Sequence, residues 1–238
     1  MPAKKKTERD HIAEARERIL AAAIPNVAFD GWSAKTLARA VRSSGVDAGL
    51  ATLAFPRGVI DLALAFHADG DRRMVEALRS RDLSRMRFSE RIATAIRLRL
   101  EAITDREAAR RGASLFALPV YAADGAAAIW RTADAIWNCL GDKSQDVGWY
   151  TKRMTLAAVY SSCLLYWLGD ESPGGIRTRE FIARRIDEVM RVERLKERLR
   201  ENPLGRAFQK GPGRLLDRIR APGQSRVSDL PGHIGGTG

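Results

Sequence analysis

The residues of this chain that could do chemistry are few and scattered. His67 and Asp71 are four residues apart, which places them on one helix face, but two ligands do not complete a metal site. A surface or core histidine is the favoured interpretation. Cys139 and Cys163 show neither a CxxC spacing nor a partner histidine, so we expect buried, reduced thiols. Without a GxSxG, GxGxxG, HExxH or P-loop motif, we expect no catalysis, metal or bound catalytic cofactor.

A second group of side chains is suited to contact with another protein. Asp146 is a good helix-capping residue, and Trp149 and Tyr150 follow it, beside Lys152 and Arg153. Aromatic side chains at a rigid helix start bury a large area for little entropy, so we expect a partly exposed pair. For Trp149 two interpretations stay open at this point: a docking anchor, or a staple that holds the helix to the core.

Residues 154–169 carry no charge. The run is shorter than the roughly 20 residues of a membrane-spanning helix, so we expect a core helix that is surrounded on all sides. Its apolar side chains and those expected to face it form either a solid core or a slot for an apolar ligand, and the residues alone favour a solid core. These side chains are Ile96, Leu100, Leu115, Phe116, Trp130, Trp137, Leu156, Val159, Tyr160, Cys163, Leu164 and Trp167.

Apolar periodicity and capping residues predict helices throughout and no convincing strand, hence an all-α fold. Pro25 is expected to end the first helix. Three short helices before a long fourth one are typical of the DNA-binding region of TetR regulators. The expected helices span about 8–23, 33–43, 47–54, 58–83, 88–103, 106–118, 126–140, 146–168 and 176–200.

The segment in the position of a recognition helix, 46–55, lacks the side chains that read bases. It contains Thr52 but no Lys, Arg, Asn or Gln. Arg42 and Arg57 flank it, and contacts from them to phosphates would not specify a sequence. We therefore expect no specific nucleic-acid partner.

The net charge of +12 and the pI near 10.4 indicate an acidic partner, either nucleic acid or an anionic membrane. Residues 191–220 hold ten basic and four acidic residues, a net charge of +6. A basic amphipathic segment gains about 1 kcal/mol per Lys or Arg near an anionic bilayer, whereas the alternative is a solvated tail. Pro203 and residues 211–213 favour two short pieces over one helix. The expected membrane-facing residues are Leu195, Leu199, Leu204, Phe208, Leu215, Leu216 and Ile219.

Three segments taken together resemble a ubiquinone-biosynthesis accessory family, the ninth of the yeast Coq proteins. They are WRTADAIWN at 130–138, DVGWYTKRMTLAAVY at 146–160 and LLYWLGDESP at 164–173. VAFDGWS at 27–33 and LAFPRG at 53–58 are similar to its N-terminal half, and the resemblance covers roughly 15–195.

The resemblance implies a TetR-like helical fold that binds lipid instead of DNA. Family members bind an isoprenoid quinone intermediate in the C-terminal half. They present it to the di-iron demethoxyubiquinone hydroxylase and touch the membrane through a C-terminal amphipathic helix. The family's hydroxylase-docking patch falls here on Asp146, Trp149 and Tyr150, which favours the docking interpretation of Trp149.

We therefore expect five regions: a basic tail (1–10), a helix-turn-helix-like region (11–82), a lipid-binding region (83–194), a membrane-associating segment (195–220) and a disordered tail (221–238). No apolar signal or long import presequence is seen, so we expect a peripheral protein on the cytoplasmic face of a bacterial inner membrane. The eukaryotic relatives would occupy the mitochondrial matrix side. The oligomeric state, a homodimer included, stays open. The alternatives are a TetR-type regulator with a hydrophobic effector and a helical scaffold without ligand.

Overall fold

The computed structural model describes residues 7–201, and the side chains of residues 7–195 within them. The described residues contain helices and no strand, which confirms the predicted all-α class. The helices are α1 (Glu8–Asp30), α2 (Ala34–Ser44), α3 (Ala48–Ala54), α4 (Val59–Arg79), α5 (Phe88–Glu101), α6 (Arg106–Phe116), α7 (Ala122–Cys139), α8 (Val147–Gly169) and α9 (Ile176–Glu201), with a 3-10 turn at Pro173–Gly175.

Helix α1 does not end at Pro25, so that prediction was wrong. It continues to Asp30, where Gly31 closes it with a positive φ of 65°. Pro25 lies on the exposed side of the helix, while Ala23 and Val27 beside it are fully buried. A proline inside a helix costs about 3 kcal/mol through its missing N–H and ring clash. Burial of the opposite face offsets this cost.

Local capping chemistry sets the other helix starts near their predicted positions. Ser33 accepts a bond from the Thr36 N–H at the start of α2, and Asp47 accepts bonds from two N–H groups at the start of α3. Helix α7 begins at Ala122 rather than 126 because its first turn is held from outside: Asp124 accepts a 2.9 Å bond from Arg57. Helix α4 ends at Arg79 rather than 83. The Ser80 N–H still bonds to the Glu76 carbonyl, four residues back, but the Arg81 N–H bonds to the Leu78 carbonyl, three residues back, which closes the last turn.

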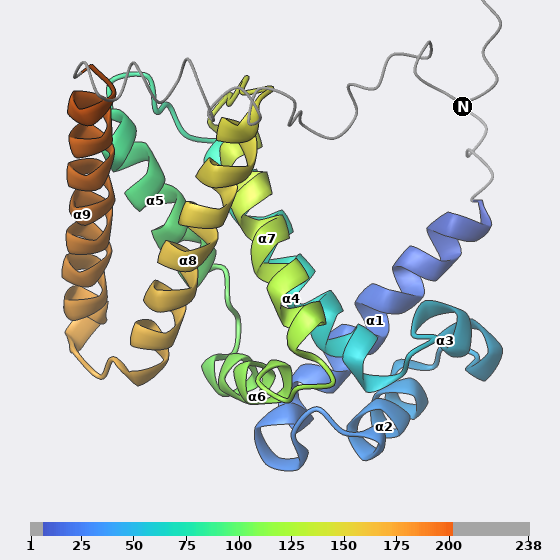
Figure 1. Ribbon diagram of the computed structural model, residues 1–238. Coiled ribbons are helices and arrows are strands. Elements are labelled where there is room, and N and C mark those ends of the chain that lie inside the picture. Colours follow the sequence, from blue (N-terminus) through green and yellow to red (C-terminus); the bar gives the residue numbers. More distant parts are fainter. Residues whose placement is uncertain (1–6, 202–238) are drawn as a thin grey trace, which may run out of the picture.

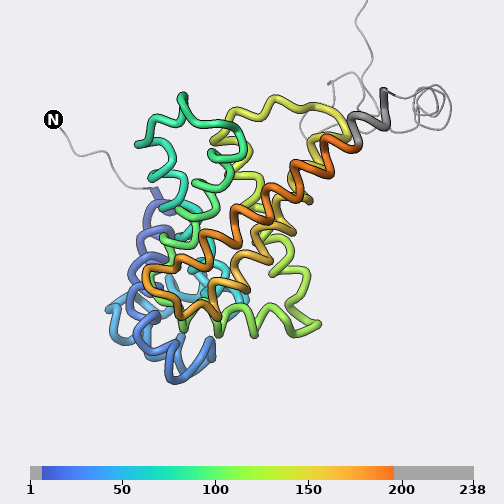
Figure 2. The backbone as a smooth tube through the Cα atoms, turned by 90° about the vertical axis from the view of Figure 1, so that its left-hand side faces the viewer, coloured from blue at the N-terminus to red at the C-terminus, as the bar shows by residue number. Residues whose placement is uncertain are grey.

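Two hydrophobic cores share the long helix α4. The first joins α1, α2, α3, α4 and α6 around Ile19, Val27 and Leu62. The second joins α4, α5, α7, α8 and α9 around Ile96, Ile136 and Leu156. Figure 1 shows α1–α3 at one end of the molecule and α9 at the other, with α4 and α7 between them. In Figure 2, turned by 90°, α9 runs obliquely across the molecule in front of the other helices.

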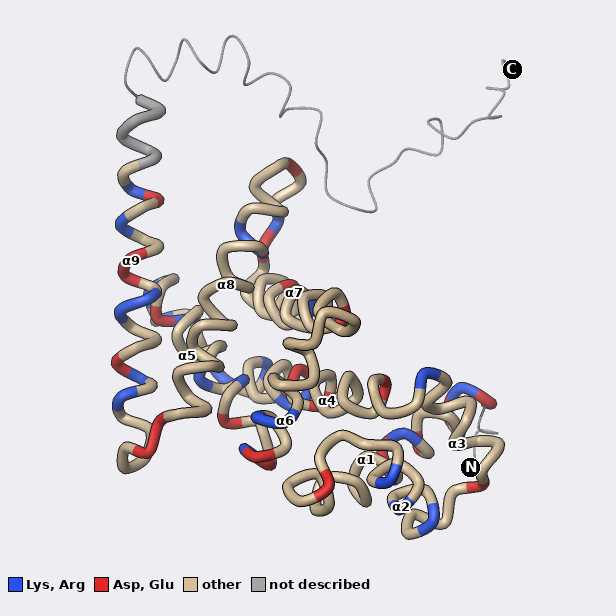
Figure 3. Tube along the Cα trace, turned by 60° about the horizontal axis from the view of Figure 1, so that its bottom comes forward, with Lys and Arg blue, Asp and Glu red and all other residues tan. Residues whose placement is uncertain are grey.

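Helix α8 is a core helix but is not surrounded on all sides, so that expectation was wrong. Leu156, Tyr160 and Cys163 are buried against α5, α7 and α9, whereas Met154 and Leu165 on the outer face are 59% and 64% exposed. Figure 3 shows this stretch of α8 without charges, in contrast to the mixed charges along α9. In the described part of the chain no single helix has the length and apolar character to cross a membrane; α3 and α4 pass that test only as a pair bent by 66°.

Candidate functional site

A cavity of about 260 Å³ lies between α4, α6, α7 and α8. We call it the α4–α8 cavity. Its space comes from small residues, chiefly on α6 and α7, because side chains no larger than a methyl group leave room between packed helices. Its apolar lining residues are Ala63, Phe66, Ala102, Ile103, Ala109, Gly112, Ala113, Phe116, Ala117, Ala122, Gly125, Ala126, Ile129, Leu164 and Leu165.

The rim of the α4–α8 cavity is apolar and exposed to solvent. Leu165 lines the cavity and is 64% exposed. Ala117 and Ala122 also line it, and in the loop between them Leu118 and Val120 are 48% and 73% exposed. Exposed apolar residues grouped around an apolar cavity are typical of ligand or membrane contact.

One wall of this cavity is polar and is held by a buried arginine. The Nε of Arg99, which is 2% exposed, donates a 2.6 Å bond to Asp71 Oδ1, and its Nη2 donates to the His67 carbonyl at 2.9 Å. Thr132 on α7 donates to the same Asp71 oxygen at 2.7 Å. The guanidinium lies 5.7 Å from the centre of the Tyr160 ring. Four helices therefore contribute to a fixed polar wall beside an apolar space.

Burial and neighbouring charges set the protonation of this wall. Burial would raise the pKa of Asp71, but His67, Arg99 and Thr132 outweigh it, and the pKa lies below its ordinary value. Burial is the largest influence on His67 and lowers its pKa; Asp71 opposes this shift, and the charge of Arg99 adds to it. Burial raises the pKa of Tyr160 to about 12. At neutral pH the wall therefore holds a charged Asp71–Arg99 pair beside a neutral histidine and a neutral tyrosine.

Two glycines let the helices approach at this cavity. A Cβ on Gly70 would lie 2.5 Å from Arg99 Nη1, so the guanidinium occupies the place of a side chain there. A Cβ on Gly125 of α7 would lie 2.7 Å from the Cβ of Phe116 on α6. Both glycines are buried, and larger residues would push apart the elements that form the cavity.

A second cavity of about 540 Å³, the α5–α9 cavity, lies among α5, α8 and α9. Its wall combines apolar side chains with the charged residues Asp146, Lys152 and Glu193. The indole N–H of Trp137 on its wall donates to the Lys152 carbonyl at 3.1 Å. This more polar cavity begins at the same end of α8 as the predicted docking residues.

The predicted lipid-contacting residues divide among several places. Phe116, Tyr160 and Leu164 line the α4–α8 cavity, and Trp137, Leu156 and Val159 line the α5–α9 cavity. Six line neither of these cavities: Ile96, Leu100 and Cys163 are buried in the second core, Leu115 packs on the first, Trp130 contacts Trp149, and Trp167 lies under the guanidinium of Arg106 at 4.8 Å.

Sequence reasoning did not assign the small residues of α6 and α7, or His67 and Arg99, to this site. The signal in the sequence was the row Ala109, Gly112, Ala113 and Phe116, which places small residues on one face of a helix. His67 was interpreted as a surface or core histidine. It lies in the polar wall of the α4–α8 cavity, with its side chain 14% exposed. The described residues hold no group of three potential metal ligands.

The aromatic residues at the start of α8 form a cluster. The rings of Trp149 and Tyr150 meet edge to face with centres 4.8 Å apart, and both contact Trp130 on α7. Both are half-buried, so one side packs on α7 while part of each ring faces outward. Asp146 caps α8 as predicted, accepting a 2.9 Å bond from the Gly148 N–H.

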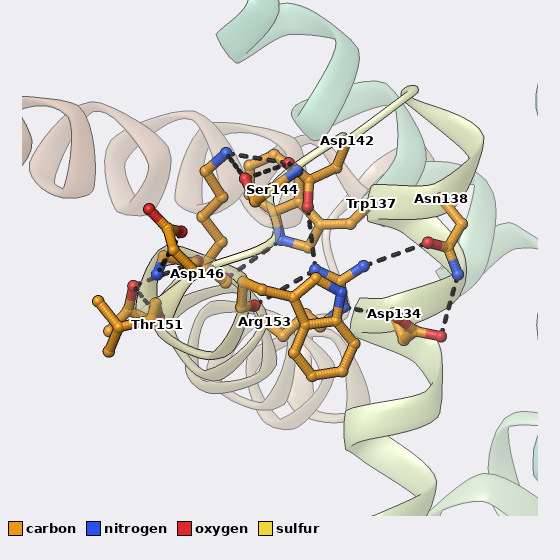
Figure 4. Close-up of polar contacts among 12 residues, drawn as sticks. Asp134, Trp137, Asn138, Asp142, Ser144, Asp146, Thr151 and Arg153 are labelled. Carbon is orange, nitrogen blue, oxygen red and sulfur yellow. Dashed lines mark hydrogen bonds and ion pairs between the residues drawn. The ribbon is translucent and has the colours of Figure 1, made fainter. Parts of the chain in front are cut away.

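Arg153, which follows the aromatic pair in the sequence, is buried beneath this cluster. Its side chain is 1% exposed, and the guanidinium lies 4.0 Å from the centre of the Trp149 ring. It donates to Asp134 at 2.6 Å, Asp142 at 3.0 Å and Asn138 at 3.2 Å. Figure 4 shows the guanidinium held between α7 and the loop before α8.

Asp142 in that loop completes the network. It also accepts bonds from Lys152 at 2.9 Å and Ser144 at 2.8 Å (Figure 4). Burial alone would raise its pKa, but the bonds from Lys152, Ser144 and Arg153 lower the pKa to about 2. The aromatic cluster therefore packs on a buried network of ion pairs and hydrogen bonds around Arg153, which holds the Trp149 ring in one place.

The remaining predicted residues lie at the two ends of the chain. In the N-terminal region, the exposed face of α3 consists of Ala48, Gly49, Thr52 and Leu53, and the Thr52 hydroxyl donates to the Ala48 carbonyl. Leu195 on α9 is 58% exposed, while the side chain of Leu199 on the same helix is not described. Residues 1–6 of the basic tail, Leu204, Phe208, Leu215, Leu216, Ile219 and the predicted disordered tail lie outside the described residues.

Comparison with known proteins extends the resemblance seen in the sequence. Residues 122–193, which include α7 and α8, match the COQ9 family model. The "Ubiquinone biosynthesis protein COQ9, mitochondrial" of Drosophila melanogaster is 31% identical over 183 residues, covering 75% of this chain and 56% of that protein. Its human counterpart is 27% identical over 195 residues, covering 78% of this chain and 61% of that protein. The chain thus spans less than two thirds of the length of these relatives.

A solved structure shows the same arrangement of helices. A TetR transcriptional regulator from Nitrosomonas europaea superposes with a TM-score of 0.59 and 20% identity, covering 74% of this chain and 97% of that one. At this identity the likeness shows the fold alone, and it confirms the predicted TetR-like architecture. Taken with the matches over α7 and α8, it confirms the predicted resemblance: this chain is similar to the COQ9 family and has a TetR-like fold.

Proposed function

We propose that this chain is a non-catalytic accessory protein of ubiquinone biosynthesis that binds the polyprenyl tail of an isoprenoid quinone intermediate in the α4–α8 cavity. The relatives named as ubiquinone biosynthesis proteins support the pathway. The observation that carries the lipid assignment is the apolar cavity with its exposed apolar rim, partly inside the matched region. Its volume of about 260 Å³ is just below the ~300–1,000 Å³ typical of ligand sites, so it would hold one part of a long tail.

The proposed partner is the di-iron demethoxyubiquinone hydroxylase, docked on Asp146, Trp149 and Tyr150. Aromatic side chains that are already fixed lose little entropy on binding, which makes them effective anchors. Arg153 beneath the Trp149 ring supplies that fixation. The patch and the cavity are both built on α7 and α8, so one pair of helices would join lipid binding to docking.

The proposed place of action is the surface of an anionic membrane, the cytoplasmic face of the inner membrane in a bacterium. Support comes from the net charge of +6 in residues 191–220 and from the exposed Leu195. Leu118 and Val120 at the cavity rim would meet the bilayer as the lipid enters. Apolar insertion together with basic residues gives reversible rather than permanent attachment.

The second candidate function is a TetR-type regulator with a hydrophobic effector, which the fold and the cavity both allow. The exposed face of α3 disfavours it. A helix that reads DNA needs side chains that bond to base edges, and Thr52 is the one such polar side chain on that face. A mobility shift on the native promoter, run at stated salt, would give a discrete complex for a regulator.

A variant that fills the cavity tests the lipid assignment. Ala113 lines the cavity, whereas its neighbour Ser114 is exposed on the same helix. Ala113→Phe is expected to reduce the polyprenyl lipid extracted per protein at least fivefold, and Ser114→Phe is the matched control that should leave it unchanged. Circular dichroism confirms that each variant folds. Equal lipid content in both variants would place the lipid elsewhere.

A further inference from the structure

Two polar atoms on the wall of the α4–α8 cavity have no partner within the described part of the chain. They are the hydroxyl of Tyr160 on α8 and Nε2 of His67 on α4. Tyr160 is completely buried, and the His67 atom is also shielded from solvent. Leaving a buried polar group unpaired costs stability, so such groups in a native protein need an explanation. Asp71 and Arg99 beside them are already paired with each other.

His67 is held in one orientation and one protonation state. Its Nδ1 faces Oδ2 of Asp71 at 3.7 Å, and the adjacent Arg99 disfavours a second positive charge. The proton of the neutral ring therefore belongs on Nδ1, next to the carboxylate. Nε2 is then a lone pair on the cavity wall, which can accept a hydrogen bond but cannot donate one.

Tyr160 has the complementary role. Its hydroxyl keeps its proton, because burial raises its pKa to about 12, and it can donate to an oxygen in the cavity. Arg99 and Asp71 both act on this hydroxyl electrostatically, which places it beside the polar wall. The wall thus offers a hydroxyl donor and a lone-pair acceptor, on different helices.

We infer, building on the proposed function, that this wall binds the ring end of the isoprenoid lipid and prefers a ring with a free hydroxyl, as in a hydroquinone or phenol, over the oxidised quinone. A ring hydroxyl donates to His67 Nε2, and a ring oxygen accepts from Tyr160. A quinone carbonyl only accepts, so it satisfies Tyr160 and leaves the histidine lone pair buried without a donor. Sites that bond to a hydroxyl reject analogues lacking it for this reason.

Calorimetric titration of the full chain, under anaerobic conditions, tests this preference. The probes are decylubiquinone, its hydroquinone, and farnesol, which has an isoprenoid tail and no ring. The wild-type protein is expected to bind the hydroquinone about fivefold more tightly than the quinone, the effect of one hydrogen bond. His67→Asn keeps an amide toward Asp71 and removes Nε2, so the preference should disappear.

Tyr160→Phe should weaken both ring forms equally and keep their ratio, because both accept from the hydroxyl. Tyr166→Phe is the matched control: this second tyrosine of α8 stacks on Phe181 at 4.2 Å and lines neither cavity. Farnesol binding should be the same in all folded variants. Unchanged hydroquinone affinity in His67→Asn, or equal binding of both ring forms by the wild type, would overturn the inference while leaving the tail site intact. Absence of binding by all three probes would overturn the proposed function as well.

Discussion

Replacing Arg153 by Met tests whether a buried charge network supports the proposed docking patch. Methionine keeps the length and the apolar stem of the side chain but removes the guanidinium. The charge that is lost lies within 2.6 Å of Asp134 and 3.0 Å of Asp142 and is almost completely buried. The variant therefore leaves two carboxylates without a common partner.

The expected cost follows from the positions of the two carboxylates. Breaking a buried ion pair from one side costs about 3–5 kcal/mol, mainly because the remaining charge is stranded. Asp134 is 36% exposed and can regain water, and Asp142 keeps Lys152 and Ser144. These relieving contacts favour the lower end, about 3 kcal/mol. For a domain of this size that corresponds to a fall in Tm of roughly 6–12 °C.

Urea unfolding followed by circular dichroism gives this free energy. Arg87→Met is the matched control, because Arg87 pairs with Glu90 but is 82% exposed, and its loss should leave stability unchanged. The Trp149 ring should also become more mobile in Arg153→Met, seen as lower tryptophan fluorescence anisotropy. A loss of stability below about 1 kcal/mol would show that the network is not a structural base for the patch.

Three further predictions follow. Trp149→Ala should leave folding and lipid content unchanged while the cells accumulate the demethoxy intermediate; normal ubiquinone levels would refute the docking assignment. The pKa of Asp142 is lowered from 3.8 to about 2. The ionised carboxylate should therefore contribute at most roughly 2 kcal/mol to the free energy of unfolding. This contribution should be fully present above the pKa of the unfolded chain, near 3.8, and decline as the pH falls below it. Asp142→Asn should flatten that part of the profile of unfolding free energy against pH, and an unaltered slope would contradict the assignment. Gly125→Ala should lose about 1–3 kcal/mol in urea unfolding, because the new Cβ lies 2.7 Å from Phe116 Cβ; a wild-type midpoint would show that α6 moves freely.

Much of the fold could be predicted from local signals. Ser33, Asp47 and Asp146 cap helices where their side-chain chemistry indicated, and the order of short and long helices pointed to the TetR-like arrangement. The predicted helix end at Pro25 was wrong because proline disfavours a helix locally, whereas Val27 on the opposite side of α1 is fully buried. Packing energy from distant residues outweighed the local preference.

The site was harder to predict because its parts are far apart in the chain. Asp71 meets Arg99 across 28 residues and Thr132 across 61, and nothing in the spacing indicates either contact. The large apolar residues alone favoured a solid core, and the lipid slot was expected only from the family resemblance. The space is made by small residues, which leave little mark on a sequence pattern. Arg153 illustrates the same limit, since its burial depends on carboxylates supplied by α7 and the following loop.

The central claim, that the α4–α8 cavity holds an isoprenoid lipid, is tested most directly by mass spectrometry of solvent extracts from freshly purified protein. We predict a polyprenylated aromatic lipid in near-stoichiometric amount from the wild type and its loss from Ala113→Phe. Recovery of phospholipid alone, or of no lipid, from wild-type protein would contradict the claim.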